Sequence, residues 1–207
     1  FLENDPSWGA RSVLSVGSLG SPGAFSSGMN SDGLALADTR IGWRRPGTGW
    51  LRYLLMNEIL IRTTSVTEAI AYIRSQPHVG GGSLVLADAY GNKAAVELAS
   101  DKVFVDRSEK TCVGRTNHFL ARDLKVDQTR STRDPNSSNS EGRLDRIDHW
   151  QRSGNAGTRS LETLVRLLGY HAIDDEPALC RHGENDGSQT ISTTLFACKS
   201  RRLYFCP

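Results

Sequence analysis

The chain has 207 residues, of which 38% are hydrophobic and 23% charged, and its formal net charge is +2 at pH 7. This length suffices for a domain with a substantial core, and the composition is typical of an ordered globular protein. The small net charge argues against a nucleic-acid partner, and no apolar run reaches the ~18 residues that cross a bilayer.

The first third of the chain has the pattern of short strands joined by tight turns. Residues 12–16 (SVLSV) predict a strand after a start rich in Gly, Ser and Pro. Residues 24–30 and 33–38 are two further runs separated by Asn30-Ser31-Asp32. Because Asn and Asp tolerate left-handed backbone and Gly33 has no side-chain clash, this pattern predicts a hairpin.

The central part predicts two helices and then several strands. Apolar residues recur at nearly helical spacing over residues 50–61. Ser65-Val66-Thr67-Glu68 has the pattern of a capping box, which predicts a helix to about Ser75, before Pro77. A turn at Gly80-Gly81-Gly82 follows. Four short runs then predict antiparallel strands: residues 83–88 and 94–98, which join at residues 90–92, and residues 103–105 and 111–113.

The last third begins with polar sequence and ends in a predicted hairpin. Residues 127–143 contain few apolar side chains and predict a segment that is either an exposed loop or partly disordered. Residues 144–150 and 160–168 predict helices, and residues 192–198 and 202–206 predict the two strands of a hairpin. No repeat or strong linker occurs, so we predict one domain over residues 1–207, with an antiparallel sheet packed by helices.

The four cysteines have no pattern of a metal or redox motif. Cys112, Cys180, Cys198 and Cys206 lack C-x-x-C spacing, so we expect no metal site. Two states remain open for them. We favour free thiols in a reducing compartment such as the cytoplasm over disulfides.

Asn117 is the residue most suited to chemistry. It follows a predicted strand, where its amide can either donate to a developing oxyanion or close an Asx turn. Three roles are open for the neighbouring His118: a general base, a hydrogen-bonding core residue or a capping residue. No G-x-S-x-G, P-loop or H-E-x-x-H sequence occurs, so serine-hydrolase, phosphate-loop and zincin chemistry lack support.

Three segments together resemble the peptidase C45 family of N-terminal-nucleophile hydrolases, to which the acyl-coenzyme A:6-aminopenicillanic acid acyltransferases belong. They are Arg115-Thr116-Asn117-His118, Gly28-Met29-Asn30-Ser31-Asp32-Gly33-Leu34 and Leu179-Cys180-Arg181-His182. The resemblance implies an α+β fold, a four-layer αββα sandwich with antiparallel sheets. It also implies amide hydrolysis or acyl transfer through a cysteine thioester, with no cofactor.

The resemblance assigns roles to individual residues. Asn117 is the expected oxyanion donor, with Thr116, His118, Thr190 and Asn30 as expected substrate-binding residues. Two positions depart from the family pattern. Arg115 replaces a His, which we expect to alter the pocket wall, and Thr190-Ile191 replaces a Ser-Arg pair. The lost guanidinium leaves an acidic substrate group without a partner and argues against penicillin-type substrates.

The nucleophile that the resemblance implies is a cysteine freed by self-cleavage, whose α-amine activates its own thiol. Phe1 has no hydroxyl or thiol, so we expect this cysteine in a preceding segment or chain. Cys112 and Cys180 are better explained as structural. The expected partner is a small N-acyl substrate, with an acyl-CoA or an amine acceptor. Two alternatives remain open: a non-catalytic or degenerate member that binds a ligand or partner chain, and an amidase for long apolar acyl chains.

Overall fold

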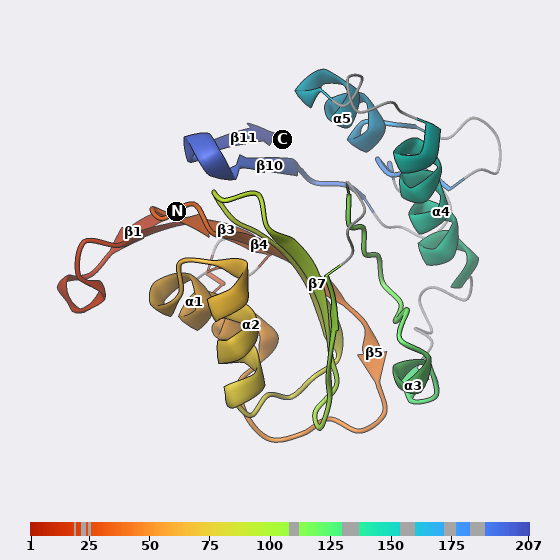
Figure 1. The fold of residues 1–207 in the computed structure, drawn as a ribbon. Helices are drawn as coiled ribbons and strands as arrows, with labels where there is room; N and C mark the ends of the chain where they lie inside the picture. The colour runs from red at the N-terminus through yellow and green to blue at the C-terminus, as the bar shows by residue number, and fades with distance from the viewer. Residues whose placement is uncertain are drawn as a thin grey trace. The chain divides into compact units, whose positions relative to one another are not determined.

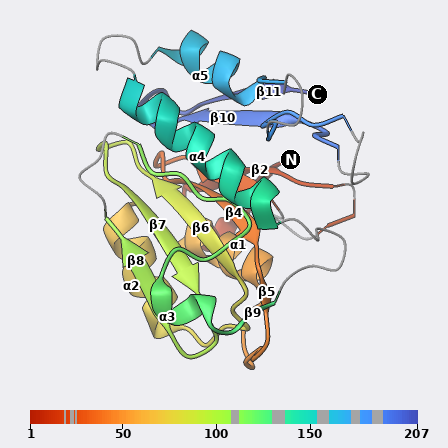
Figure 2. The ribbon, with the colours of Figure 1, turned by 90° about the vertical axis from the view of Figure 1, so that its right-hand side faces the viewer.

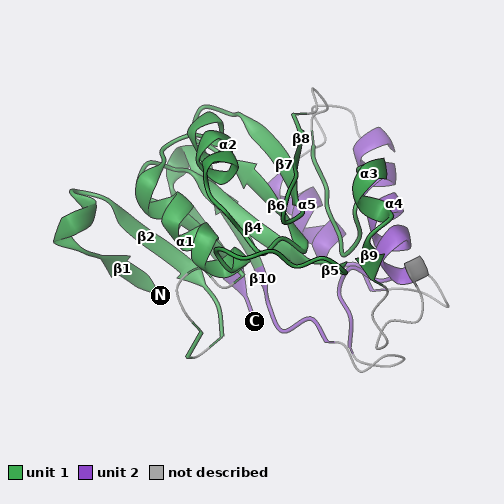
Figure 3. Cartoon of the chain, turned by 90° about the horizontal axis from the view of Figure 1, so that it is seen from below, with its two compact units in different colours: residues 1–129, 194–204 green, residues 130–193, 205–207 purple. Residues whose placement is uncertain are grey.

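The computed structural model describes residues 1–18, 20–21, 24, 26–107, 112–129, 137–153, 160–171, 177–182 and 189–207. The chain divides into two compact units, coloured separately in Figure 3. The first unit comprises residues 1–129 and 194–204, and the second comprises residues 130–193 and 205–207. That residues 1–207 act as a single domain stays a prediction.

A seven-stranded sheet forms the centre of the first unit (Figure 1). Every pair of neighbouring strands in it is antiparallel. In spatial order the strands are β1 (Leu2–Asn4), β2 (Ser12–Val16), β3 (Ser27–Asn30), β4 (Ala35–Arg40), β6 (Gly82–Ala87), β7 (Lys93–Leu98) and β8 (Val103–Asp106). The predicted α+β class with antiparallel sheets is therefore confirmed.

Two helices, α1 (Arg52–Arg62) and α2 (Val66–Ser75), cover one face of this sheet (Figure 1). Their buried side chains, among them Leu55, Ile59 and Ile70, pack with strand residues such as Leu84 and Val96 into one core cluster. Each such side chain contributes roughly 1.5–3 kcal/mol when fully buried. The apolar spacing that predicts α1 is thus the spacing of the residues that meet the sheet.

The opposite face of the sheet carries a row of polar side chains. Thr39 pairs with Ser83, and Ser83 pairs with Glu97, so the three residues lie side by side across β4, β6 and β7. Their positions alternate with those of Leu84 and Val96, which pack with the helices. The polar row therefore lies on the helix-free face.

Only one of the two hydrogen bonds of the predicted capping box forms at the start of α2. The Ser65 hydroxyl accepts a hydrogen bond from the Glu68 amide at 3.3 Å. The Glu68 carboxylate, however, accepts from the Thr64 amide at 2.8 Å and not from Ser65. The helix ends at Ser75, before Pro77, as predicted.

Asp88 ties the start of α2 to the β6–β7 turn. One carboxylate oxygen accepts a hydrogen bond from the Val66 amide, and the other accepts from the Tyr90 and Asn92 amides, all at 3.0 Å. Burial alone would raise the pKa of Asp88. The hydrogen bonds from Val66, Asn92 and Tyr90 outweigh burial and hold this pKa below its ordinary value.

Asp88→Asn is expected to lower the free energy of unfolding by about 1–3 kcal/mol at neutral pH, because charged acceptors form the stronger hydrogen bonds. Since the folded-state pKa is lowered, this contribution is complete above the unfolded-state pKa, near 3.8. It is lost as the pH falls through the lower folded-state value. Urea denaturation at neutral and acidic pH measures both effects. A difference between the two proteins that stays constant with pH would contradict the assignment.

Four short elements of the first unit are not predicted by the sequence. Strand β5 (Gly42–Trp43) pairs with β9 (Gln128–Thr129), and helix α3 (Arg122–Lys125) precedes β9 (Figure 2). A 3-10 turn, η1 (Pro6–Trp8), follows β1. The apolar residues of this region form a second core cluster: Ile41, Ala99, Phe119, Ala121 and Leu124, with Trp43 packed against it.

The remaining elements include the predicted terminal hairpin. Strands β10 (Thr193–Ala197) and β11 (Arg202–Cys206) pair through the 3-10 turn η3 (Cys198–Ser200). The second unit contains α4 (Ser137–Ser153) and α5 (Leu161–Leu168). None of the helices in the described ranges has the length and hydropathy needed to span a membrane.

Two predictions of local structure are wrong. Residues 127–143 are not one loop, because residues 128–129 form β9 and residues 137–143 begin α4. Residues 130–136 lie outside the described residues. The strand predicted over residues 111–113 does not form at Cys112 and Val113, and Thr111 is not described.

Candidate active site

Asn117 is the exposed residue of an otherwise buried pentapeptide. Its neighbours Arg115, Thr116, His118 and Phe119 are 9%, 3%, 7% and 0% exposed, respectively, whereas Asn117 itself is exposed. The buried neighbours hold the backbone on both sides of it. The segment therefore presents one carboxamide from a fixed support.

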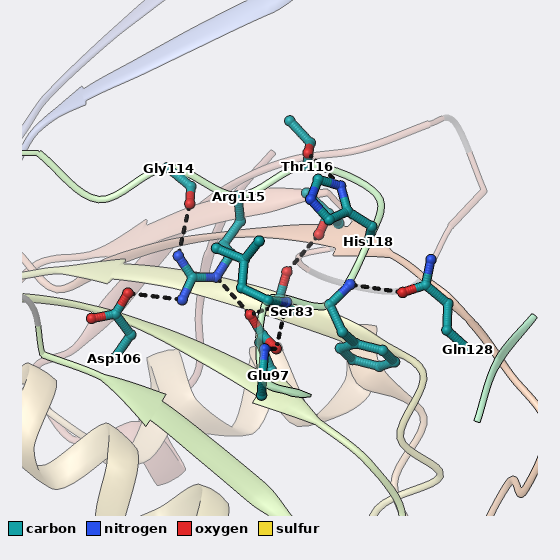
Figure 4. A network of polar contacts seen from close by, with 12 residues as sticks. Ser83, Glu97, Asp106, Gly114, Arg115, Thr116, His118 and Gln128 are labelled. Carbon is teal, nitrogen blue, oxygen red and sulfur yellow. Dashed lines mark hydrogen bonds and ion pairs between the residues drawn. The ribbon is translucent and has the colours of Figure 1, made fainter. Parts of the chain in front are cut away.

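Glu97 on β7 is the main support of this segment (Figure 4). Its side chain is fully buried, at 0% exposure, and one carboxylate oxygen accepts from Arg115 Nε at 2.9 Å. The carboxylate also accepts from the amides of Leu120 and Ala121, both at 3.0 Å. A single carboxylate thus fastens the chain before and after Asn117.

Arg115 completes this buried ion-pair network. It lies between Glu97 and Asp106 (Figure 4), and its Nη2 donates to Asp106 at 2.9 Å. Its Nη1 donates to the Gly114 carbonyl at 2.8 Å. The side chain is 3% exposed, so Arg115 braces the segment from inside. The expectation that Arg115 alters the pocket wall stays a prediction.

Phe119 anchors the other end of the pentapeptide. Its amide donates to the Gln128 side chain at 2.9 Å. Its ring meets Trp43 edge to face, with centroids 5.6 Å apart and an angle of 82°. Because Gln128 and Trp43 are paired across β9 and β5, this small sheet holds Phe119 in place.

The Asn117 side chain reaches the end of β4. Its Nδ2 donates to the Arg40 carbonyl at 3.0 Å. A primary amide carries two N–H donors, and this bond uses one of them while it orients the amide plane. The neighbouring Thr116 hydroxyl and His118 Nδ1 lie 3.2 Å apart in the interior. The substrate-binding roles of Thr116 and His118 stay predictions.

A cavity of about 630 Å³ lies beside Arg40. Its lining includes Arg40, Asp38 and Arg52 together with the aromatic side chains of Trp43 and Tyr53. Asp38 and Arg52 form an ion pair at 2.5 Å. Burial raises the pKa of Asp38, and Arg52 offsets this rise only in part. The volume falls within the roughly 300–1,000 Å³ of small-molecule sites.

Asn30, a predicted substrate-binding residue, hydrogen-bonds to backbone atoms. Its Nδ2 donates to the carbonyls of Leu60 at 2.9 Å and Thr63 at 2.7 Å, and its Oδ1 accepts from the Leu34 amide at 3.0 Å. The β3–β4 turn is thereby tied to the end of α1. These bonds account for Asn30 as a scaffold residue, and its contact with substrate stays a prediction.

Thr190, the last predicted substrate-binding residue, belongs to the second unit. Its hydroxyl accepts from the Arg181 amide at 3.0 Å, and its own amide donates to the Arg181 carbonyl at 2.9 Å. Asn117, Thr116, His118 and Asn30 all belong to the first unit. Among these predicted residues, Thr116, Asn117 and His118 are consecutive and lie on one segment.

All four cysteines lie within the described ranges and carry thiols. Burial raises the pKa of the Cys198 thiol, which disfavours the reactive thiolate there. At residue 1, the Phe1 backbone nitrogen donates to the Ser15 carbonyl at 2.9 Å. β1, which begins at the next residue, is the edge strand of the sheet.

Comparison with known proteins adds a family and a fold. The family model described as acyl-coenzyme A:6-aminopenicillanic acid acyl-transferase matches residues 15–207. A search of curated protein sequences found no match.

Among solved structures, a mutant of the conjugated bile acid hydrolase from Clostridium perfringens aligns with a TM-score of 0.62 and 14% identity, covering 94% of this chain and 73% of that chain. Penicillin V acylase from Agrobacterium tumefaciens aligns with a TM-score of 0.53 and 17% identity, covering 87% and 62%, respectively. At these identities the likeness shows the fold, which is the predicted N-terminal-nucleophile hydrolase type.

Proposed function

The chain belongs to the acyl-coenzyme A:6-aminopenicillanic acid acyl-transferase family, whose members are amide hydrolases and acyltransferases of the N-terminal-nucleophile type, and on this premise we propose that it transfers the acyl group of a small N-acyl compound through a cysteine thioester. Asn117 is the proposed oxyanion donor. The nucleophilic cysteine is proposed to come from a segment preceding Phe1.

The observation that supports this proposal most is the setting of Asn117. Glu97, Arg115 and Phe119 hold the segment that carries this exposed carboxamide. The carboxamide therefore needs little reorientation when negative charge develops on a substrate. Such preorganised donors stabilise an oxyanion more than mobile ones. A donor that is already fixed in place therefore suits this role.

The proposed reaction has two steps. The thiolate sulfur attacks the amide carbonyl carbon, and the carbonyl oxygen becomes an oxyanion beside the Asn117 amide. Collapse breaks the C–N bond, the leaving amine takes a proton, and an acyl-thioester remains. Water then releases an acid, or an amine or thiol acceptor takes the acyl group, and the sulfur leaves.

We place the substrate between Asn117 and the cavity beside Arg40. The Arg40 carbonyl accepts from Asn117, and Arg40 also lines the cavity. In this proposal the compound extends from the cavity past Arg40 toward Asn117, which does not itself line the cavity. The aromatic lining from Trp43 and Tyr53 suits an apolar acyl group.

The test uses the protein expressed from its complete reading frame. Incubation with N-acyl amides of graded chain length is expected to release amine and to leave an acyl adduct on an N-terminal cysteine. Intact-mass analysis measures the adduct, and hydroxylamine should remove it. Amine release without any cysteine adduct would overturn the thioester step. Ligand binding with no release from any amide would support the non-catalytic alternative. A sharp preference for long chains would favour the long-chain amidase.

A further inference from the structure

Three metal-binding side chains meet in the second unit. His171, Cys180 and His182 each offer one ligand atom, and these atoms lie within 4.8 Å of one another. The His182 Nε2 lies 2.8 Å from the His171 Nδ1. The two rings are stacked, with centroids 4.6 Å apart and an angle of 22°. Two imidazole nitrogens and a sulfur therefore converge on one small volume.

Backbone hydrogen bonds hold the two stretches that carry these ligands. The Cys180 amide donates to the carbonyl of Tyr170, the residue before His171, at 3.1 Å. On the other side, Arg181 exchanges hydrogen bonds with Thr190 at 2.9 and 3.0 Å, and His182 forms an antiparallel bridge with Gln189. The convergence of the ligands thus has support beyond the side chains themselves.

The donor set suits zinc. Zinc prefers imidazole nitrogen and thiolate sulfur, and three protein ligands leave a fourth position for water. At bond lengths of about 2.0–2.3 Å, a tetrahedral zinc ion separates its ligand atoms by about 3.3–3.6 Å. This spacing lies between the 2.8 Å of the two nitrogens and the 4.8 Å limit of the cluster. His171 and His182 are exposed, so small rotations of their side chains bring the two nitrogens to this spacing.

We propose that His171, Cys180 and His182 bind one zinc ion, with its fourth position open to water. On binding, the Cys180 sulfur forms a bond to zinc and its proton passes to solvent. The ion then links residue 171 to residues 180–182. This proposal is independent of the proposed acyl transfer, because its test measures binding and not turnover.

The test is zinc titration of the reduced, untagged full-length protein against a chromophoric chelator. One equivalent is expected to bind. Cobalt is expected to replace zinc and to give a thiolate-to-metal absorption band. Each of His171→Ala, Cys180→Ser and His182→Ala is expected to weaken zinc binding by more than the roughly 10–100-fold that loss of an outer-shell partner costs. Cys180→Ser should also abolish the cobalt band.

Two matched substitutions serve as controls. His149→Ala removes an exposed histidine of α4, and Cys206→Ser removes an exposed thiol, and neither is one of the three ligands. Both variants should bind zinc as the unmodified protein does. The proposal is overturned if less than one equivalent binds, if either control weakens binding as much as the ligand variants, or if a variant of His171 or His182 binds zinc with unchanged affinity.

Discussion

Asn117→Ala is expected to lower kcat by about 10²–10³, which is the loss that follows removal of one well-placed oxyanion donor. The reason is geometric. The Asn117 amide stands exposed between buried neighbours, with one donor bonded to the Arg40 carbonyl. Because the oxyanion exists only after attack on the amide, the loss should fall on kcat, with little change in KM. Steady-state kinetics with the best N-acyl amide measures both constants.

Two further substitutions sharpen this test. Asn117→Asp keeps the shape but removes the N–H donors, so its kcat should fall at least as far as that of the alanine variant. Asn57→Ala in α1 removes an amide whose oxygen has no hydrogen-bond partner among the described residues, and it should leave kcat unchanged. Urea denaturation shows whether each variant remains folded. Near-native kcat in a folded Asn117→Ala protein would remove Asn117 from the mechanism.

The sequence predicts the parts of this fold whose local patterns agree with their packing. The apolar spacing of residues 50–61 corresponds to α1, whose side chains Leu55, Met56, Ile59 and Leu60 are buried. The turn at Asn30-Ser31-Asp32-Gly33 likewise forms, with Gly33 at a φ of +88°. A Cβ there would stand 2.6 Å from the Cys198 carbonyl oxygen. Turn chemistry and helical period are local properties, so a single sequence reveals them.

The supports of the candidate site depend on long-range pairing, which local patterns do not contain. Glu97 lies 18 residues before Arg115 and 23 before Leu120, and only the fold brings them together. One signal was present, because Glu97 is a charged residue within the otherwise apolar run Ala94-Ala95-Val96-Glu97-Leu98. A charge in a strand that is buried on both faces requires a partner. Strands β5 and β9 are two residues each, too short to carry a periodic pattern.

Glu97→Ala is expected to lower the free energy of unfolding by about 3–5 kcal/mol, the usual cost of removing one partner from a buried ion pair. The substitution leaves Arg115 buried with Asp106 as its one charged partner in the part of the chain that the structure describes, and it deprives the Leu120 and Ala121 amides of their acceptor. In protein that remains folded, the segment around Asn117 loses its main support. Since a misplacement of about 1 Å can cost about 10²-fold in rate, kcat should fall while KM changes little.

A double variant separates stability from positioning. Arg115→Met combined with Glu97→Leu replaces the buried pair by apolar side chains, which should recover much of the stability lost in Glu97→Ala. The Leu120 and Ala121 amides still lack their acceptor, so kcat should stay low. Glu162→Ala, which breaks an ion pair whose side chains are 77% and 72% exposed, should change the unfolding free energy by no more than about 0.5 kcal/mol. If the double variant regains kcat together with stability, the role of Glu97 is to stabilise the fold and not to position Asn117.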